Sequence, residues 1–240
     1  MRRGFTLPEM LVVIAIIAIL GFILFSAAQK MIASGKTAKA TANLRQIGVL
    51  MASYTTDNNN CLPVLIDWNM GVSPDNPTQP YRFWQDLIRV QAGISMRQVA
   101  NIHTDPWLPE MFYDPTVKKK SHPWGDFGGN DMILLGIGQP SEKNCPTQFG
   151  QTRGTPLSAI GRLSQKVIVS SAMDGPGSSW GSSWYFQGDR YASEGQASTM
   201  PKPETRHGGK ALCLFADGHT EALDVIKMDS AERRKYFLRD

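Results

Sequence analysis

The chain has 240 residues, 42% of them hydrophobic, and its 25 Lys and Arg against 21 Asp and Glu give a formal charge of +4. This length allows one or two domains, and the aromatic residues that recur along it exclude a disordered chain. Residues 10–25 are an unbroken run of apolar residues and glycine, and nothing comparable follows. That distribution excludes a plain cytosolic enzyme and a multispanning transporter.

The positive charge does not indicate a nucleic-acid partner. Arg2 and Arg3 supply two of the positive charges, and without them the excess falls to +2, from 23 basic against 21 acidic residues. The longest basic run, residues 118–120, has no interleaved aromatic residues and is typical of a solvated loop. We therefore predict that the protein binds no nucleic acid.

Three interpretations compete for the N-terminal apolar segment. A secretory signal peptide would combine the basic start with Ser-Ala-Ala at residues 26–28 as a cleavage site. An ordinary membrane anchor needs about 20 apolar residues, a length that residues 10–25 approach once Phe5, Leu7 and residues 26–28 extend them. The third interpretation is a short leader that a membrane peptidase removes.

Glu9 separates these interpretations. A carboxylate at the entrance of an apolar helix costs about 2.5–3.5 kcal/mol if it is held at the membrane centre, and neither a signal peptide nor a simple anchor needs one. Cleavage between Gly4 and Phe5 would create an α-amino group four residues before Glu9. Residues 4–9, Gly-Phe-Thr-Leu-Pro-Glu, resemble the processing motif of type IV prepilins and pseudopilins. The resemblance implies that prepilin peptidase cuts after Gly4 and N-methylates Phe5.

The same resemblance implies a role for Glu9 and a location for the body. In a fibre, the Glu9 carboxylate of one subunit would pair with the Phe5 amine of a neighbour and fix their axial register, because an unpaired charge in an apolar bundle is heavily penalised. The charges leave the orientation open, since Arg2 and Arg3 favour a cytoplasmic N-terminus while basic residues also follow the apolar run. The resemblance implies a single span of the inner membrane and an extracytoplasmic body.

One long helix is predicted from about residue 8 to residue 56. After the apolar run, apolar residues recur at three- and four-residue spacings at Leu44, Ile47, Leu50, Met51 and Tyr54. No proline interrupts residues 29–56, and Asp-Asn-Asn-Asn at residues 57–60 ends the pattern. At about 1.5 Å per residue this helix is roughly 70 Å long, far more than a membrane thickness. Its second half is therefore expected to pack on the body.

The expected fold is α+β, with the long helix packed on an antiparallel sheet in a pilin-like arrangement. In the middle of the chain we expect a helix over residues 81–91, a strand over 132–137, a helix start at 155–156 and a strand over 166–171. The predicted divisions are a leader (1–4), an assembly helix (5–29), an amphipathic helix on the body (30–57) and an extracytoplasmic domain (58–240).

The strongest hairpin signal lies at residues 211–223. Two apolar runs flank Asp217 and Gly218, which are typical of a two-residue turn between antiparallel strands. Beyond the hairpin, Asp229 and Glu232 form a capping pair for a short terminal helix. The C-terminal region is therefore expected to be a hairpin followed by a helix.

A second family resemblance depends on this hairpin. His207 is followed by nine residues and then by Asp217 and Gly218, and residues 54–63 contain Tyr-x-x-Asp-Asn followed by Pro. Both features resemble a group of pseudopilin-like proteins, abundant in planctomycete-type bacteria, that is named for this His-nine-residues-Asp-Gly spacing. That group often has a Cys-Pro pair near the middle of the chain, where this sequence has Asp114 and Pro115.

Two hypotheses address what this motif does. In the first, Asp217 and Gly218 build a turn, and His207 holds the preceding glycine-rich loop by hydrogen bonds. In the second, Asp217 binds calcium, because related major pseudopilins carry calcium in a C-terminal loop. Backbone carbonyls and Asp174 or Asp189 would then supply further oxygen ligands. No EF-hand spacing is present, and the sequence implies no other metal or cofactor.

The Gly/Ser-rich stretch around residues 174–196 raises a binding hypothesis. Trp180 and Trp184, together with Tyr185 and Tyr191, would form a flat stacking face for a carbohydrate or another polymer. The alternative is that these aromatic residues cover one edge of a small core. A carbohydrate-binding face would favour an anchored binding module over a fibre subunit.

The sequence favours no enzyme. Its serines lie in no Gly-x-Ser-x-Gly elbow, its histidines have no HExxH spacing, and no phosphate-binding or dinucleotide fingerprint occurs. The three cysteines also lack metal-binding spacing. A disulfide between Cys61 and Cys145 is compatible with a body outside the cytoplasm, whereas Cys213, in an apolar strand pattern, is expected to be a small buried hydrophobic residue.

These inferences predict a structural subunit that is processed by prepilin peptidase. With other pilin or pseudopilin subunits, it would assemble into a type II secretion-like pseudopilus or a type IV pilus-like fibre. The alternative is a single-pass, membrane-anchored extracytoplasmic binding module that does not polymerise.

Overall fold

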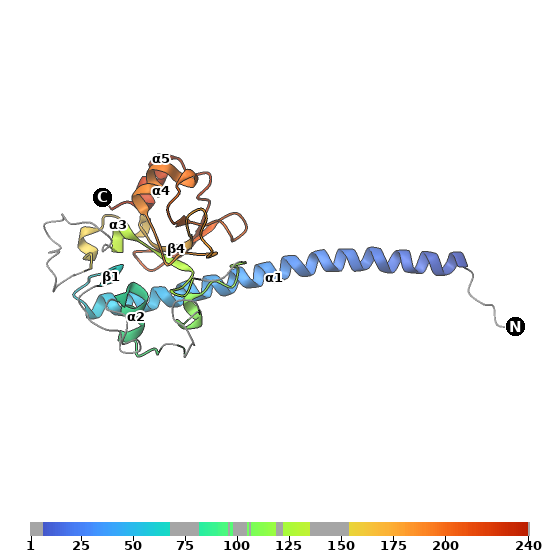
Figure 1. The fold of residues 1–240 in the computed structure, drawn as a ribbon, viewed down its shortest axis with the longest axis horizontal. Helices are drawn as coiled ribbons and strands as arrows, with labels where there is room; N and C mark the ends of the chain where they lie inside the picture. The colour runs from blue at the N-terminus through green and yellow to red at the C-terminus, as the bar shows by residue number, and fades with distance from the viewer. Residues whose placement is uncertain are drawn as a thin grey trace. The chain divides into compact units, whose positions relative to one another are not determined.

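The computed structural model describes residues 7–67, 82–95, 97, 105, 107–118, 122–134 and 154–239 (Figure 1). The chain divides into two compact units, Met1–Ala38 and Lys39–Asp240. The described part of the first unit is helical throughout, as the first part of α1 (Leu7–Asp57), and the second unit is the body.

Helix α1 confirms the helix that was predicted over residues 8–56. Within the body, the apolar stripe of this helix is buried at Ala40, Leu44, Ile47 and Met51, the three- and four-residue spacing that one face of a helix requires. The helix ends where Asn59 and Asn60 take left-handed φ angles of 54° and 57°. Asparagine tolerates this conformation better than most residues, so the polar run ends the helix as expected.

The body contains a mixed sheet of six strands. Its path runs β5 (Tyr185–Phe186), β3 (Phe127–Asn130), β4 (Val167–Met173), β7 (Ala211–Phe215) and β8 (Thr220–Leu223), and β6 (Lys202–Pro203) also pairs with β4. The β3–β5 pair is parallel and the others are antiparallel. The α+β fold is therefore confirmed, but the sheet is not purely antiparallel. A separate antiparallel pair joins β1 (Ile66–Asp67) to β2 (Arg82–Phe83).

Short helices complete the described part of the body. They are α2 (Trp84–Gln91), α3 (Asp131–Leu134), α4 (Gly188–Glu194), α5 (Ser230–Phe237) and the 3-10 turns η1 (Glu110–Phe112), η2 (Leu157–Ala159), η3 (Leu163–Gln165) and η4 (Gly195–Ala197). The predicted cap of the terminal helix is confirmed, because Asp229 accepts from Glu232 N at 2.8 Å and Glu232 accepts from Asp229 N at 3.2 Å.

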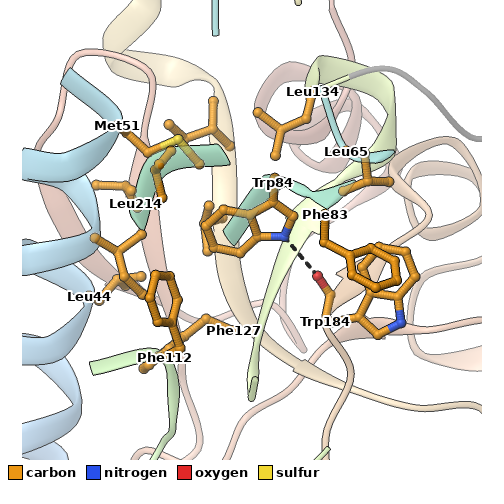
Figure 2. Close-up of a cluster of buried hydrophobic side chains, with 14 of the residues drawn as sticks. Leu44, Met51, Leu65, Phe83, Trp84, Phe112, Phe127, Leu134, Trp184 and Leu214 are labelled. Atoms are coloured by element: carbon orange, nitrogen blue, oxygen red, sulfur yellow. Dashed lines mark hydrogen bonds between the residues drawn. The ribbon is translucent and has the colours of Figure 1, made fainter. Parts of the chain in front are cut away.

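Two hydrophobic clusters lie on opposite faces of the sheet. The first joins α1 and α2 to the face of β7 that carries Leu212 and Leu214, and it has Trp84 near its centre (Figure 2). The second joins α4 and α5 to the face that carries Ala211, Cys213 and Phe215. This alternation along β7 is the two-residue period of a strand that is buried on both faces.

The strand predicted over residues 132–137 is wrong, because Asp131–Leu134 forms helix α3 and the strand is β3, just before it. A Cβ atom on Gly128 would lie 2.7 Å from Ala172 Cβ, and one on Gly129 would lie 2.7 Å from Leu134 Cδ1. Glycine is therefore needed for close packing here, although it normally weakens a strand prediction. The helix start predicted at Thr155 is only the single 3-10 turn η2.

Candidate functional site

The N-terminal part of α1 is an exposed apolar surface. Every described side chain over residues 7–36 is exposed, and an 18-residue window of the helix has a mean hydropathy of 3.0. By length and composition this helix is able to cross a membrane. Glu9 lies in its first turn and is the only acidic residue among residues 7–56. Gly4 and Phe5, the predicted cleavage and methylation sites, lie outside the described residues.

His207 begins a tight two-residue turn. Its backbone N–H donates to Lys210 O at 3.2 Å, and Lys210 N–H donates back to His207 O at 3.2 Å. Gly208 and Gly209, between them, have φ angles of +63° and +86°. Glycine adopts positive φ angles at little cost, so the sequence Gly-Gly favours this turn.

The ring of His207 contacts a carboxylate 93 residues earlier in the chain. Its Nε2 lies 2.9 Å from Oδ2 of Asp114, and both side chains are essentially buried. Thr116 donates to the other oxygen of Asp114 from its backbone N–H at 2.8 Å and its hydroxyl at 2.6 Å, and Arg206 Nη1 lies 3.8 Å from Oδ2. Burial alone would raise the pKa of Asp114, but His207, Arg206 and Thr116 more than offset it and hold that pKa below its usual value.

A second buried carboxylate, Asp126, supports the first. Its Oδ2 accepts from the backbone N–H of Asp114 at 2.9 Å, and its Oδ1 accepts from His122 N at 3.2 Å and from the Ser182 hydroxyl. Burial lowers the pKa of His122 to about 4, so this imidazole is neutral at neutral pH. These buried polar residues therefore join the loop of residues 107–118 to Ser182 and to the turn that begins at His207.

Asp217 and Gly218 lie in the loop of the β7–β8 hairpin. Phe215 N–H donates to His219 O at 2.9 Å, and Gly218 N–H donates to Phe215 O at 2.9 Å, which leaves three residues in the loop. Gly218 has a φ angle of +90°, and Asp217 Oδ1 accepts from His219 N at 3.1 Å. The predicted hairpin is confirmed, but its loop has three residues with glycine in the last position, not two.

The two ends of the His-nine-residues-Asp-Gly motif both lead to α1 within the body. At one end, a Cβ atom on Gly48 of α1 would lie 3.5 Å from Gly218 O, so the hairpin loop packs directly against the helix. At the other end, His207 contacts Asp114, whose loop accepts a hydrogen bond from Asn43 of α1 to Tyr113 O at 2.9 Å. The motif thus brackets β7 and ties both of its ends to one helix.

The expected partner of His207 was different. We expected its hydrogen bonds to hold the neighbouring glycine-rich loop, which the backbone turn does, but the side chain binds Asp114. Only one feature of the sequence indicated Asp114. Asp114 and Pro115 occupy the position at which the pseudopilin-like group with the His-nine-residues-Asp-Gly spacing often has a Cys-Pro pair. A contact across 93 residues has no local periodicity from which it could be predicted.

The calcium hypothesis gains no support from the described residues. Asp174 accepts from Gly175 N at 3.1 Å and from the Ser178 hydroxyl at 2.7 Å, and Asp189 accepts from Arg190 N. Asp217 accepts from His219, as described above. Within the part of the chain that the structure describes, no three His, Cys, Asp or Glu side chains gather as a metal site.

The prediction that Trp180 and Trp184 form an exposed stacking face is wrong for Trp184. That side chain is 8% exposed, its ring centroid lies 4.4 Å from that of Phe83, and its carbonyl accepts from Trp84 Nε1 at 3.0 Å (Figure 2). Trp184 is therefore part of the core. Trp180 is half-buried and packs 5.2 Å from the His122 ring, which leaves no flat pair of exposed rings.

The two cysteines that the structure describes differ in burial. Cys213 is a fully buried residue of β7, as predicted, and burial raises the pKa of its thiol to about 12. Cys61 is half-buried and forms no disulfide with a described residue. Cys145 lies outside the described residues, so the Cys61–Cys145 disulfide stays a prediction.

Comparison with known proteins identifies the N-terminus. Residues 1–25 match the family model described as the prokaryotic N-terminal methylation motif. Searches of curated proteins and of solved structures each gave no match to the chain. The match, together with the exposed apolar helix, supports a prepilin-type, membrane-anchored protein that is a substrate of prepilin peptidase and has pilin-type partners in general.

Proposed function

We propose that this chain is a structural subunit of a type II secretion-like pseudopilus or a type IV pilus-like fibre. Prepilin peptidase cuts it after Gly4 and N-methylates Phe5, and the body then lies outside the inner membrane. The observation that supports this most is the methylation motif at residues 1–25, which continues directly into an exposed apolar helix. A pilin-like α+β body and the absence of a catalytic sequence motif fit a non-enzymatic role.

The assembly step follows from the charge of Glu9. Cleavage places a positive α-amine at Phe5, and Glu9 is the nearest acidic side chain to it in the sequence. In an apolar bundle of helices the two charges are stabilised by each other, whereas either alone is costly. Pairing between neighbouring subunits fixes one axial register. Glu9 therefore acts in assembly and has no catalytic role.

We also place the chain with the pseudopilin-like group that carries the His-nine-residues-Asp-Gly spacing. What supports this is that His207 and Gly218 each make contacts that depend on their identity: a buried hydrogen bond to Asp114 and a left-handed turn against α1. In this proposal the motif keeps the body fixed to the helix that assembles.

Photo-crosslinking in cells that make the fibre tests this function. A photoreactive residue at Ile17 or Leu24, whose side chains are 62% and 69% exposed on α1, should give covalent products with the same chain or with a major pseudopilin. Glu9→Gln removes the charge without hindering membrane insertion, so it should abolish these products while the protein level is unchanged. An anchored binding module that does not polymerise would give no such products even with Glu9 present.

A further inference from the structure

The part of α1 that follows the apolar run, residues 26–56, is basic and has no acidic residue. Between Glu9 and Asp57 the sequence contains Lys30, Lys36 and two further basic residues, with no Asp or Glu. The two further residues, Lys39 and Arg45, have partners in the body, because Lys39 forms an ion pair with Glu110 and Arg45 donates to Thr220.

Lys30 and Lys36 are different from these two. Both are exposed, and no carboxylate among the described residues pairs with either of them. Their charge therefore has no partner within the described part of the chain. A charge that lies next to a membrane span is available to whatever lies at the membrane surface.

The length of the apolar segment places these lysines at the membrane surface. Residues 7–28 rise about 33 Å at 1.5 Å per residue, and the hydrocarbon core of a bilayer is about 30 Å thick. Lys30 therefore follows the apolar segment immediately, at the level of the lipid headgroups. Lys36 lies about 9 Å further along the helix, within about one Debye length at physiological salt. Met31 and Ile32, both exposed, lie beside Lys30 and suit the boundary layer.

We infer that residues 30–36 of α1 bind the headgroups of anionic phospholipids, with the ammonium groups of Lys30 and Lys36 on the phosphodiesters. This rests on the proposed function in two respects: α1 spans a membrane, and the body lies outside it. Lysines on the body side of the span run against the usual distribution of positive charge, and an anionic headgroup supplies the counter-charge that the chain lacks. The subunit is thereby held at one depth in the bilayer before it assembles.

Spin-labelled lipids test this with the full chain reconstituted in bilayers of phosphatidylcholine and phosphatidylglycerol. Lipid beside a spanning helix gives a motionally restricted electron-spin-resonance component, which is measured separately for each lipid label. We expect the restricted component to prefer phosphatidylglycerol over phosphatidylcholine by about 5-fold per lysine, or roughly 30-fold for the pair, at low salt. The preference should fall steeply at about 1 M salt, where the Debye length is about 3 Å.

Matched variants separate this site from the overall charge. Lys30→Gln/Lys36→Gln should bring the preference close to one, and Lys30→Arg/Lys36→Arg should retain it. Arg234→Gln/Lys235→Gln removes the same charge from exposed positions of α5 and should leave the preference unchanged.

The outcomes distinguish this inference from the proposed function. If no restricted lipid is seen at all, α1 does not span the bilayer and the proposed membrane anchoring fails. If restricted lipid is present but the unaltered chain shows no preference, or the α5 variant loses it equally, this inference is overturned and the lysines face an acidic protein surface instead.

Discussion

Replacing His207 by alanine tests whether the motif holds the body together. The substitution removes the ring from a contact of 2.9 Å in which both side chains are at most 1% exposed, and it leaves the Asp114 carboxylate buried. A buried polar group that loses a hydrogen-bond partner typically costs about 1–3 kcal/mol, and more when the group is charged, as a carboxylate is. Because Thr116 still donates two hydrogen bonds to Asp114, we expect a loss of about 2–3 kcal/mol in the free energy of unfolding. Urea unfolding of the full chain in detergent, followed by tryptophan fluorescence, measures this loss.

His219 provides the matched control. Its ring also contacts an aspartate, Asp217, but the two side chains are 42% and 34% exposed, and exposed pairs contribute about 0–1 kcal/mol. His219→Ala should therefore cost less than about 1 kcal/mol. Equal losses for the two histidine variants, or a loss under about 1 kcal/mol for His207→Ala, would mean that the buried contact with Asp114 does not stabilise the body.

The pKa of Asp114 adds a pH signature to the same experiment. Because this pKa is lower in the folded state than in the unfolded state, its contribution to stability is present above the unfolded value of about 3.9 and is lost as the pH falls through the folded value. The free energy of unfolding should therefore change less between neutral and strongly acid pH in His207→Ala than in the unaltered chain. If this change in the free energy of unfolding is the same in both proteins, the contact with His207 does not lower the pKa of Asp114.

Burial raises the pKa of Asp131 to about 6, so the ionisation of this carboxyl group destabilises the folded state as the pH rises through that value. Asp131→Asn can still accept the hydrogen bond from Gly188 N. In urea unfolding, this variant should raise the free energy of unfolding by up to about 3 kcal/mol at pH 7.5 and leave it unchanged at pH 4. Gly218→Ala should cost about 1–2 kcal/mol because its φ angle is +90°, and a melting temperature equal to that of the unaltered chain would contradict this. Glu9→Gln should leave cleavage after Gly4 intact while fibres are lost from electron micrographs, and abundant fibres would contradict the charge-pairing role.

The elements with a strong local pattern could be predicted from the sequence. Helix α1, the β7–β8 hairpin and the cap at Asp229 each depend on neighbours within a few residues, and the structure confirms them. Strand β3 was missed because its glycines are selected by close packing against other parts of the body, so local strand propensity points the wrong way. The hairpin loop was misjudged by one residue, because Asp-Gly fits both a two-residue loop and the end of a three-residue loop.

The candidate sites also differ in whether they depend on local sequence or on distant contacts. The N-terminal motif is contiguous and needs no tertiary information, so the sequence alone was enough to indicate it. The partner of His207 and the burial of Trp184 depend on contacts across 93 and about 100 residues. The composition of a Gly/Ser-rich stretch gives no measure of such burial, which is why Trp184 was misplaced on a surface.

Mass spectrometry of the native N-terminus, on protein purified from the membrane of cells that make it, shows whether prepilin peptidase processes the chain. We expect a mature chain that begins at N-methylated Phe5, with the α-amine that Glu9 requires. A chain that keeps its initial Met-Arg-Arg-Gly, or one that begins at Gln29 after signal-peptide cleavage, would show that this processing does not occur.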